Sequence, residues 1–156
     1  MFREMRRKER AMEKTEIAEI LKTATNGVLA VTGDDDYPYA VPLSFVYENN
    51  KIYFHSTNEN SHKIDAISKN PKVSFCVVTK DEIVPEDFTT SFKSIVVFGK
   101  ASVLTKKDEI LEIMMLIARK YCSSHMSQAP NYAKSYLEEF CIVEIEIEHL
   151  TGKTKD

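Results

Sequence analysis

Glycine is scarce in this chain of 156 residues, which contains only four, and cysteine is scarcer, with three. No G-x-G-x-x-G pattern or P-loop is present, so the dinucleotide-binding and nucleotide-hydrolase classes lose their main support. Cys76, Cys122 and Cys141 form no C-x-x-C pair, which argues against a disulfide framework or a structural zinc site. No acidic or thiol side chain stands at ligand spacing from His55 and His62, so we expect no bound metal.

Long apolar runs and an excess of basic residues are also missing. No run reaches membrane-spanning length, and residues 1–16 are charged throughout, unlike a signal peptide. The formal net charge of −3 argues against nonspecific nucleic-acid binding, which usually needs a basic face. We therefore expect a cytoplasmic protein that binds neither membranes nor nucleic acid.

The length and composition suit a single globular domain over residues 1–156. Basic residues cluster only near the N-terminus, mixed with two glutamates (Arg3, Arg6, Arg7, Lys8 and Arg10 with Glu4 and Glu9). We interpret residues 1–12 as a flexible arm. The alternative is an arm that reaches a phosphate or a partner subunit.

Hydrophobic patterning predicts an α+β domain that is mainly β. Helical spacing or capping marks four segments: residues 17–24, a helix from Asn60 or Ser61 to Asn70, residues 110–121 and a short stretch near 132–137. Alternating or apolar runs predict six strands, over residues 28–32, 39–47, 52–56, 73–78, 94–104 and 141–147. Short links between the early strands favour an antiparallel, barrel-like arrangement.

Several residues mark where these elements end or bend. Pro42 cannot donate to a strand ladder, so it indicates a sheet edge, a bulge or a segment facing a ligand. The turn at residues 48–50 predicts a hairpin, because asparagine tolerates positive φ. We expect a polar loop over residues 79–93, and we place His125 in a loop and His149 after the last strand, both on the surface.

The densest polar cluster runs from His55 to Lys63, from the end of a predicted strand to the start of a helix. Free backbone N–H groups and the positive end of the helix dipole meet at such a junction, which suits an anion. Lys63 adds a cation where the helix favours acidic side chains, and Ser56, Ser61 and His62 add hydrogen-bond donors. An anionic ligand resolves that conflict; the alternative, favoured by spacing alone, is an ordinary capped loop in solvent.

Six motifs follow one another over nearly the whole chain: Gly27–Val31, Tyr37–Leu43, Lys51–Ser56, His62–Asp65, Asn70–Phe75 and Ser94–Ala101. In this order they resemble the pyridoxamine 5′-phosphate oxidase-like split barrels. Together with the N-terminal Met5-Arg6-Arg7-Lys8, they are most similar to the 5-nitroimidazole-resistance (Nim) branch of that superfamily.

The resemblance implies a six-stranded antiparallel split β-barrel with flanking helices, which forms a homodimer with FMN in a groove at the subunit interface. It implies that the second strand lines the flavin with backbone and small polar groups, and that a strand end, a helix start and a later strand complete the site. The implied flavin-binding residues are Val41, Pro42, Leu43, Ser44, His55, Ser56, Ser61, His62, Lys63 and Ser94. Of these, His62 and Lys63 are phosphate ligands, and the other subunit can supply Ser94.

Two departures from the family concern arginines. Ala40 and His62 stand where the true oxidases have arginine, so two arginine–phosphate contacts are missing. Ser61 stands where the Nim branch usually has glycine. We therefore do not expect a true pyridoxamine phosphate oxidase.

The function implied is that of an FMN-dependent oxidoreductase that reduces a small flat electron acceptor, such as a nitroimidazole-like compound. His55 is the candidate proton donor, because a histidine titrates near neutral pH. The alternatives are a non-catalytic module that binds flavin or haem, and an interaction protein that has lost the pocket.

Overall fold

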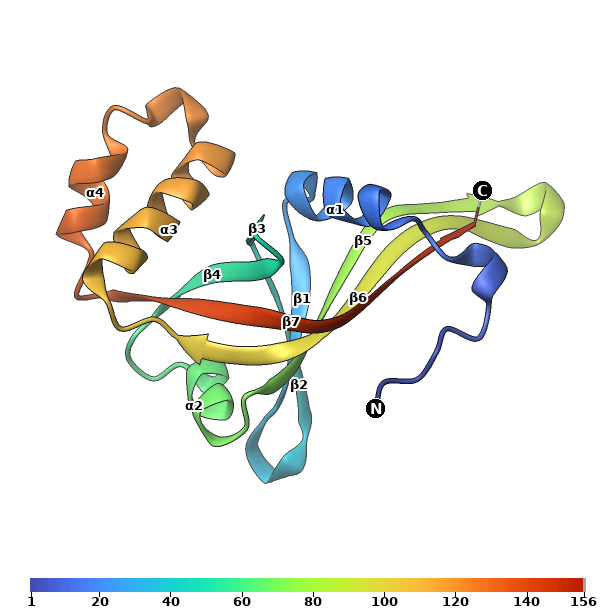
Figure 1. Ribbon diagram of the computed structural model, residues 1–156, viewed down its shortest axis with the longest axis horizontal. Helices are drawn as coiled ribbons and strands as arrows, with labels where there is room; N and C mark the ends of the chain where they lie inside the picture. Colours follow the sequence, from blue (N-terminus) through green and yellow to red (C-terminus); the bar gives the residue numbers. More distant parts are fainter. Residues whose placement is uncertain (156) are drawn as a thin grey trace.

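The computed structural model of the protein describes residues 1–155 and contains one antiparallel sheet of seven strands, in the order β2-β1-β5-β6-β7-β4-β3 (Figure 1). The strands are β1 (Gly27–Thr32), β2 (Pro38–Leu43), β3 (Val46–Glu48), β4 (Lys51–Thr57), β5 (Lys72–Val84), β6 (Thr89–Val103) and β7 (Phe140–Lys155). The two edge strands, β2 and β3, are consecutive in the chain. The sheet is therefore curled so that its edges meet at one short connection, as in a split barrel.

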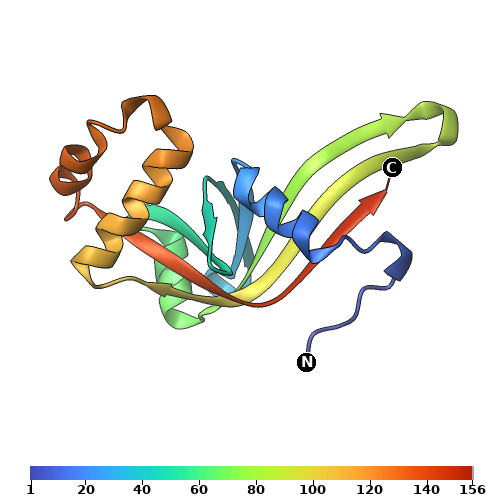
Figure 2. The same ribbon diagram turned by 45° about the horizontal axis from the view of Figure 1, so that its top comes forward.

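Four α-helices flank this sheet: α1 (Lys14–Thr23), α2 (His62–Lys69), α3 (Lys107–Tyr121) and α4 (Ala129–Ser135). Short 3-10 turns lie before α1, between β1 and β2, between β5 and β6, and between α3 and α4: η1 (Lys8–Arg10), η2 (Asp34–Asp36), η3 (Pro85–Asp87) and η4 (Ser123–His125). Helices α3 and α4 form a pair at one end of the molecule, and the β5–β6 hairpin extends from the other end (Figures 1 and 2). The predicted α+β split barrel with flanking helices is confirmed.

The strand number differs from the prediction because the run predicted as one strand, residues 39–47, is divided into β2 and β3. The break falls at Phe45, whose side chain is fully buried in the core. Its backbone groups bond side chains of α3: its N–H donates to the Tyr121 hydroxyl at 3.0 Å, and its carbonyl accepts from Tyr121 at 2.6 Å and from Lys120 at 3.0 Å. A helix distant in sequence thus satisfies the polar groups that the break removes from the ladder.

Replacing Tyr121 by phenylalanine should destabilise the fold by about 1–3 kcal/mol. The Phe45 amide would lose its acceptor, and the Thr25 carbonyl would lose the donor that it shares with the Phe45 carbonyl, which keeps Lys120. Urea denaturation followed by circular dichroism measures the loss. The control is Tyr37→Phe, because that side chain is 74% exposed and should leave the midpoint unchanged. Equal midpoints for the two variants would contradict the bracing role of Tyr121.

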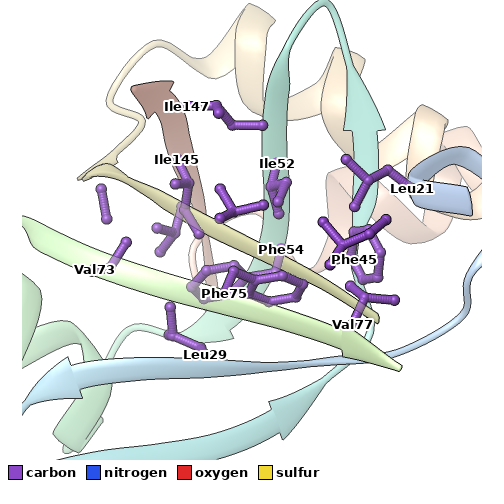
Figure 3. Packing of buried hydrophobic residues seen from close by; sticks show 14 of the residues in the cluster. Leu21, Leu29, Phe45, Ile52, Phe54, Val73, Phe75, Val77, Ile145 and Ile147 are labelled. Carbon is purple, nitrogen blue, oxygen red and sulfur yellow. The ribbon is translucent and has the colours of Figure 1, made fainter. Parts of the chain in front are cut away.

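The core lies inside the curled sheet, where alternate residues of each strand face one another (Figure 3). Phe54 and Phe75 point into it with Phe45, whose ring lies edge-on to that of Phe75 at a centroid distance of 5.0 Å. A second apolar cluster joins α3 to the opposite face of β4 and β7 through Tyr53 and Ile142. β4 lies between these two clusters, so one of its faces packs in the barrel core and the other faces α3.

The predicted polar loop over residues 79–93 is wrong, because β5 continues to Val84 and β6 begins at Thr89. The two strands form a hairpin arm whose ladder shifts register between Val78 and Lys80. Most side chains of the β5 half of the arm are exposed, whereas those of the β6 half are half-buried and Ser91 is buried, so polarity alone predicts a loop. The strands of the arm are defined by backbone hydrogen bonds between β5 and β6, which do not depend on side-chain polarity.

Two further boundaries differ from the predictions. His149 lies within β7, half-buried, and not after the last strand on the surface, because β7 runs on to Lys155. Helix α4 begins at Ala129, a few residues before the stretch near 132–137 that was predicted to be helical, and Pro130 occupies its first turn. Within the predicted N-terminal arm, Ala11 bridges to β7 and Met12 is buried against the core.

Candidate functional site

The polar cluster predicted between His55 and Lys63 surrounds the junction of β4 and α2. Ser56 and Ser61 are both buried, and their hydroxyl oxygens lie 3.2 Å apart. Ser61 precedes α2 but makes no side-chain cap. Within residues 1–155, the backbone N–H groups of His62 and Lys63 have no acceptor. The start of α2 therefore presents two free donors at the positive end of the helix dipole.

The Lys63 ammonium is a positive charge without an anionic partner among the described residues at this junction. Its side chain is half-buried, and no hydrogen bond or ion pair joins it to another described residue. Its charge reaches two neighbours: it lowers the pKa of His55, and it opposes the rise that burial causes in the pKa of Cys141. A cation in the first turn of a helix is unfavourable for the helix, so an anion bound between Lys63 and the free amides would stabilise the junction.

His62 ties the start of α2 to the β1–β2 connection. Its ring stacks on Tyr39 of β2 at a centroid distance of 4.2 Å, and its Nε2 accepts a hydrogen bond from the Asp34 amide at 3.3 Å. Gly33 leaves the space for this contact, because a Cβ there would lie 3.0 Å from Nε2. With Nε2 accepting, the neutral ring carries its proton on Nδ1, which is then the nitrogen free to donate to a ligand.

His55 lies apart from this group. Because β4 alternates, Ser56 points to the barrel interior while His55 points to the opposite face, towards α3 and α4. There its ring meets Phe140 edge-on at 5.7 Å. It lines a cavity of about 360 Å³ whose other walls are mostly apolar: Met114, Met115, Ile117, Ala118, Cys122, His125, Gln128, Ala129, Tyr132, Ala133 and Phe140.

His55 keeps much of its surface exposed, but its partial burial against this wall lowers its pKa, and the nearby Lys63 ammonium lowers it further. Both effects disfavour the charged imidazolium, so His55 loses its proton at a lower pH than an ordinary histidine, near 6.5. Proton NMR should place its midpoint below that value. In Lys63→Ala the midpoint should rise, whereas Lys69→Ala, on the exposed end of the same helix, should leave it unchanged. Equal midpoints in all three proteins would contradict the proximity of Lys63 to His55.

The remaining predicted residues lie on two strands. In β2, Val41 and Leu43 pack against the core, Pro42 is exposed and Ser44 follows at the bend. This strand is a sheet edge, which confirms the edge interpretation of Pro42, and the Tyr39–His62 contact brings it beside α2. Ser94 pairs with Val78 and Lys153 in the middle of the sheet, so a single chain does not join it to α2.

The cavity beside His55 was missed in the sequence. Met114 and Met115 lie on α3, and the helical spacing that predicts a helix over residues 110–121 gives no sign of a cavity there. The space arises because Ala118, Ala129 and Ala133 on the facing helices are too small to fill it. The only signal was this run of small side chains opposite methionines, which becomes informative once α4 is known to pair with α3.

Two classes of site can be checked over the described part of the chain. Residues 1–155 contain no group of three or more His, Cys, Asp or Glu side chains placed to hold a metal ion. None of the helices in that range has the length and apolar character needed to cross a membrane.

Solved structures share this fold. A proposed 5-nitroimidazole antibiotic resistance protein from Bacteroides thetaiotaomicron VPI-5482 has a TM-score of 0.78 at 24% identity, covering 92% of this chain and 85% of that one. A FAD-binding protein from Mesorhizobium loti has a TM-score of 0.64 at 24% identity, covering 94% and 98%. The heme storage protein from Vibrio cholerae has a TM-score of 0.67 at 17% identity, covering 90% and 94%. At these identities the likeness establishes the fold alone.

The family assignment comes from sequence. No curated protein matches the chain. The family model described as pyridoxamine 5′-phosphate oxidase, however, matches residues 13–154, which include every strand except the last residue of β7 and all of the β4–α2 junction. The chain therefore belongs to the pyridoxamine 5′-phosphate oxidase family.

Proposed function

We propose that this protein binds FMN as a homodimer and reduces small flat electron acceptors. The observation that carries the proposal is Lys63, a half-buried cation without an anionic partner among the described residues, beside two free amides at the start of α2. This donor set fits a phosphate group, which accepts hydrogen bonds from amides and is attracted by the charge. The neighbouring similar structures include a FAD-binding protein, which supports a flavin as the ligand.

Each residue of the junction has a defined part in this binding. Lys63 supplies the full charge, and His62 donates from Nδ1 while its Nε2 stays bonded to Asp34. Ser56 and Ser61, buried and bonded to each other, hold the loop before α2 in place, so their part is to position the free amides at the start of that helix. β2 lies beside α2 and presents its free edge, with the residues from Val41 to Ser44, to the rest of the flavin.

The cavity beside His55 is the proposed acceptor site. Its 360 Å³ exceeds the roughly 150 Å³ that an apolar cavity needs to take up benzene, so a compound of one or two rings fits. Bound flavin would supply the redox chemistry. The lowered pKa keeps His55 neutral at pH 7, so it hydrogen-bonds a polar group of the acceptor and delivers a proton only after taking one from solvent.

The outer face of the barrel supports the homodimer. Val28, Val78 and Phe98 are exposed by 38%, 59% and 38%, and Ile83 continues this apolar surface onto the arm at 79%. Exposed apolar surface of this kind marks interaction sites. Ser94 lies on the same face, since it is paired with Val78. A second copy seated there would bring its own Ser94 towards the flavin.

Two further properties follow. The exposed Ala40 on β2 and His62 on α2 offer no guanidinium, so we do not propose pyridoxamine phosphate oxidation. The three cysteines are free, which fits the reducing conditions of the cytoplasm that we propose as its location.

The decisive experiment is titration of the purified protein with FMN. We expect flavin fluorescence to be quenched at one FMN per subunit, and sedimentation velocity to give a dimer. Turnover of a reduced nicotinamide with nitroaromatic acceptors would then establish the oxidoreductase. FMN binding without turnover would favour the non-catalytic module, and a protein that ignores FMN would overturn the proposal.

A further inference from the structure

We infer that the hollow between α1, β3 and α3 binds a diphosphate group, either as free pyrophosphate or as part of an organic ligand. The hollow has a volume of about 260 Å³, and its lining includes Lys22, Tyr47, Glu48, Leu116, Arg119 and Lys120. It shares no lining residue with the cavity beside His55, with the α2 junction or with the exposed apolar residues of the outer barrel face. Three observations carry the inference: an excess of cations, a half-buried ammonium without an anion and an arginine without a partner among residues 1–155.

The hollow lies where the short strand β3 is flanked by two helices (Figures 1 and 2). Lys22 belongs to the last turn of α1, whereas Arg119 and Lys120 belong to the last turn of α3. Lys120 also joins the two helices, because its ammonium donates to the carbonyl of Ala24, which caps α1, and to that of Phe45, which precedes β3. Cations from two helices therefore line one space beside β3.

Positive charge is in excess at this hollow, although the whole chain has a formal net charge of −3. Three cations line it, and within residues 1–155 Glu48 is the one acidic side chain that does so. In the described structure Glu48 is exposed and pairs with none of these cations. Lys22 pairs with Glu19 at 3.8 Å, but both side chains are largely exposed, so that pair contributes little. An anion in the hollow would therefore meet mainly positive charge.

The charge of Lys120 is contacted by carbonyl oxygens but not neutralised by a carboxylate. Its Nζ lies 2.5 Å from the Ala24 oxygen, 3.0 Å from the Phe45 oxygen and 4.4 Å from the centre of the Phe45 ring. The side chain is half-buried, and no carboxylate of the described residues lies within ion-pair distance. Burial lowers the pKa of this lysine, as expected for a cation that loses water without gaining an anion. An ammonium has three N–H donors, so one remains for a ligand.

Arg119 supplies a second group of donors. It lines the hollow and is exposed, and its guanidinium makes no hydrogen bond or ion pair with any residue of the described chain. Arginine presents a planar fork of N–H groups that can bind two phosphate oxygens at once. Because no described residue of the fold pairs with this guanidinium, its charge is available to a ligand.

The size and lining of the hollow favour two linked anionic groups. Its volume is below the roughly 300–1,000 Å³ of pockets that enclose drug-sized molecules, so it takes a compact group and leaves the rest of a larger ligand in solvent. The cations come from two helices, so a diphosphate can direct one phosphate towards Lys22 and the other towards Arg119. The half-buried side chains of Tyr47 and Leu116 give the carbon-containing part of an organic ligand a surface to pack on.

Calorimetric titration of the full chain saturated with FMN tests the inference, because FMN then occupies the phosphate site proposed at α2. Pyrophosphate and ADP are the test ligands, and adenosine is the uncharged control that should not bind. We expect one diphosphate per subunit, bound less tightly as salt is added. Tighter binding of ADP than of pyrophosphate would identify an organic ligand, and equal or weaker binding of ADP would identify the free diphosphate.

Arg119→Glu should weaken pyrophosphate binding by at least about tenfold, because it removes a charge-assisted hydrogen bond and adds a repelling carboxylate. Lys134→Glu is the matched control, since it makes the same reversal of charge at an exposed side chain of α4 that does not line the hollow. It should bind pyrophosphate like the natural chain. Lys22→Ala should weaken binding roughly two- to fivefold. Lys120 is left unchanged, because it also bonds the Phe45 carbonyl in the fold.

Lys63→Ala separates this site from the α2 junction and makes the test independent of FMN binding. This variant should bind pyrophosphate as tightly as the natural chain saturated with FMN. Loss of binding in Lys63→Ala would overturn the inference, since the diphosphate would then lie at the start of α2. The inference is also overturned if Arg119→Glu binds pyrophosphate as tightly as Lys134→Glu, if adenosine binds as tightly as ADP, or if neither diphosphate shows saturable binding.

Discussion

Lys63→Ala should lower the affinity for FMN roughly 30- to 150-fold, the equivalent of about 2–3 kcal/mol for a lost charge-assisted hydrogen bond. The physical reason is that no anion among residues 1–155 pairs with Lys63, so its charge is fully available to the phosphate. The free amides at the start of α2 remain in the variant, so some binding should persist. Quenching of flavin fluorescence over a range of protein concentrations measures the two affinities.

The matched control for Lys63 lies on the same helix. The Lys69 side chain is 75% exposed at the last turn of α2, where a cation is favourable, and its one ion pair within the described residues is with Asp34 at 3.8 Å. Lys69→Ala should therefore bind FMN like the natural chain. Lys63→Arg, which keeps the charge, should retain most of the affinity. If Lys63→Ala and Lys69→Ala bind equally well, the phosphate does not lie at the start of α2.

Phe45→Ala should destabilise the protein by about 3–5 kcal/mol, the usual cost of removing a fully buried aromatic ring. Phe45 packs edge-on against Phe75, and the Lys120 ammonium lies 4.4 Å from the centre of its ring. The vacated space lies between rigid strands and α3, so it cannot collapse easily. Chemical denaturation should show a large fall in midpoint with a similar slope.

Phe88→Ala, the same substitution at a fully exposed position, should shift that midpoint by no more than about 0.5 kcal/mol. Because Phe45 holds the bend between β2 and β3, its loss should also weaken FMN binding under conditions in which the variant is still folded. A variant of Phe45 as stable as that of Phe88 would contradict the central position assigned to this ring.

Much of the candidate site was accessible from local sequence. The transition from strand to helix between Ser56 and His62 was predicted, because alternation ends there and a helical stripe begins. The surplus of hydrogen-bond donors over acceptors at that junction could be predicted from the residue types alone. The paired asparagines of the β3–β4 hairpin have φ values of 49° and 60°, as the turn prediction requires.

The separation of His55 from Ser56 had a sequence signal that was not used. Adjacent residues of a strand point to opposite faces, so the two could not both face one ligand by their side chains. What lies beyond each face was not predictable, because α3 and α4 come more than fifty residues later. The structure therefore gives His55 a cavity of its own.

The sequence by itself determined the local elements of this protein, the family and the position of the polar junction at α2, because periodicity, turn residues and motif order are properties of neighbouring residues. Only the tertiary structure decided that the strand breaks at Phe45, that residues 79–93 form an arm and that a bulge turns His149 outwards. Each of these depends on contacts between segments distant in sequence: Tyr121 and Lys120 with Phe45, β5 with β6, and β6 with β7. Backbone pairing and burial determine these three features, and neither can be predicted from the polarity of a single segment.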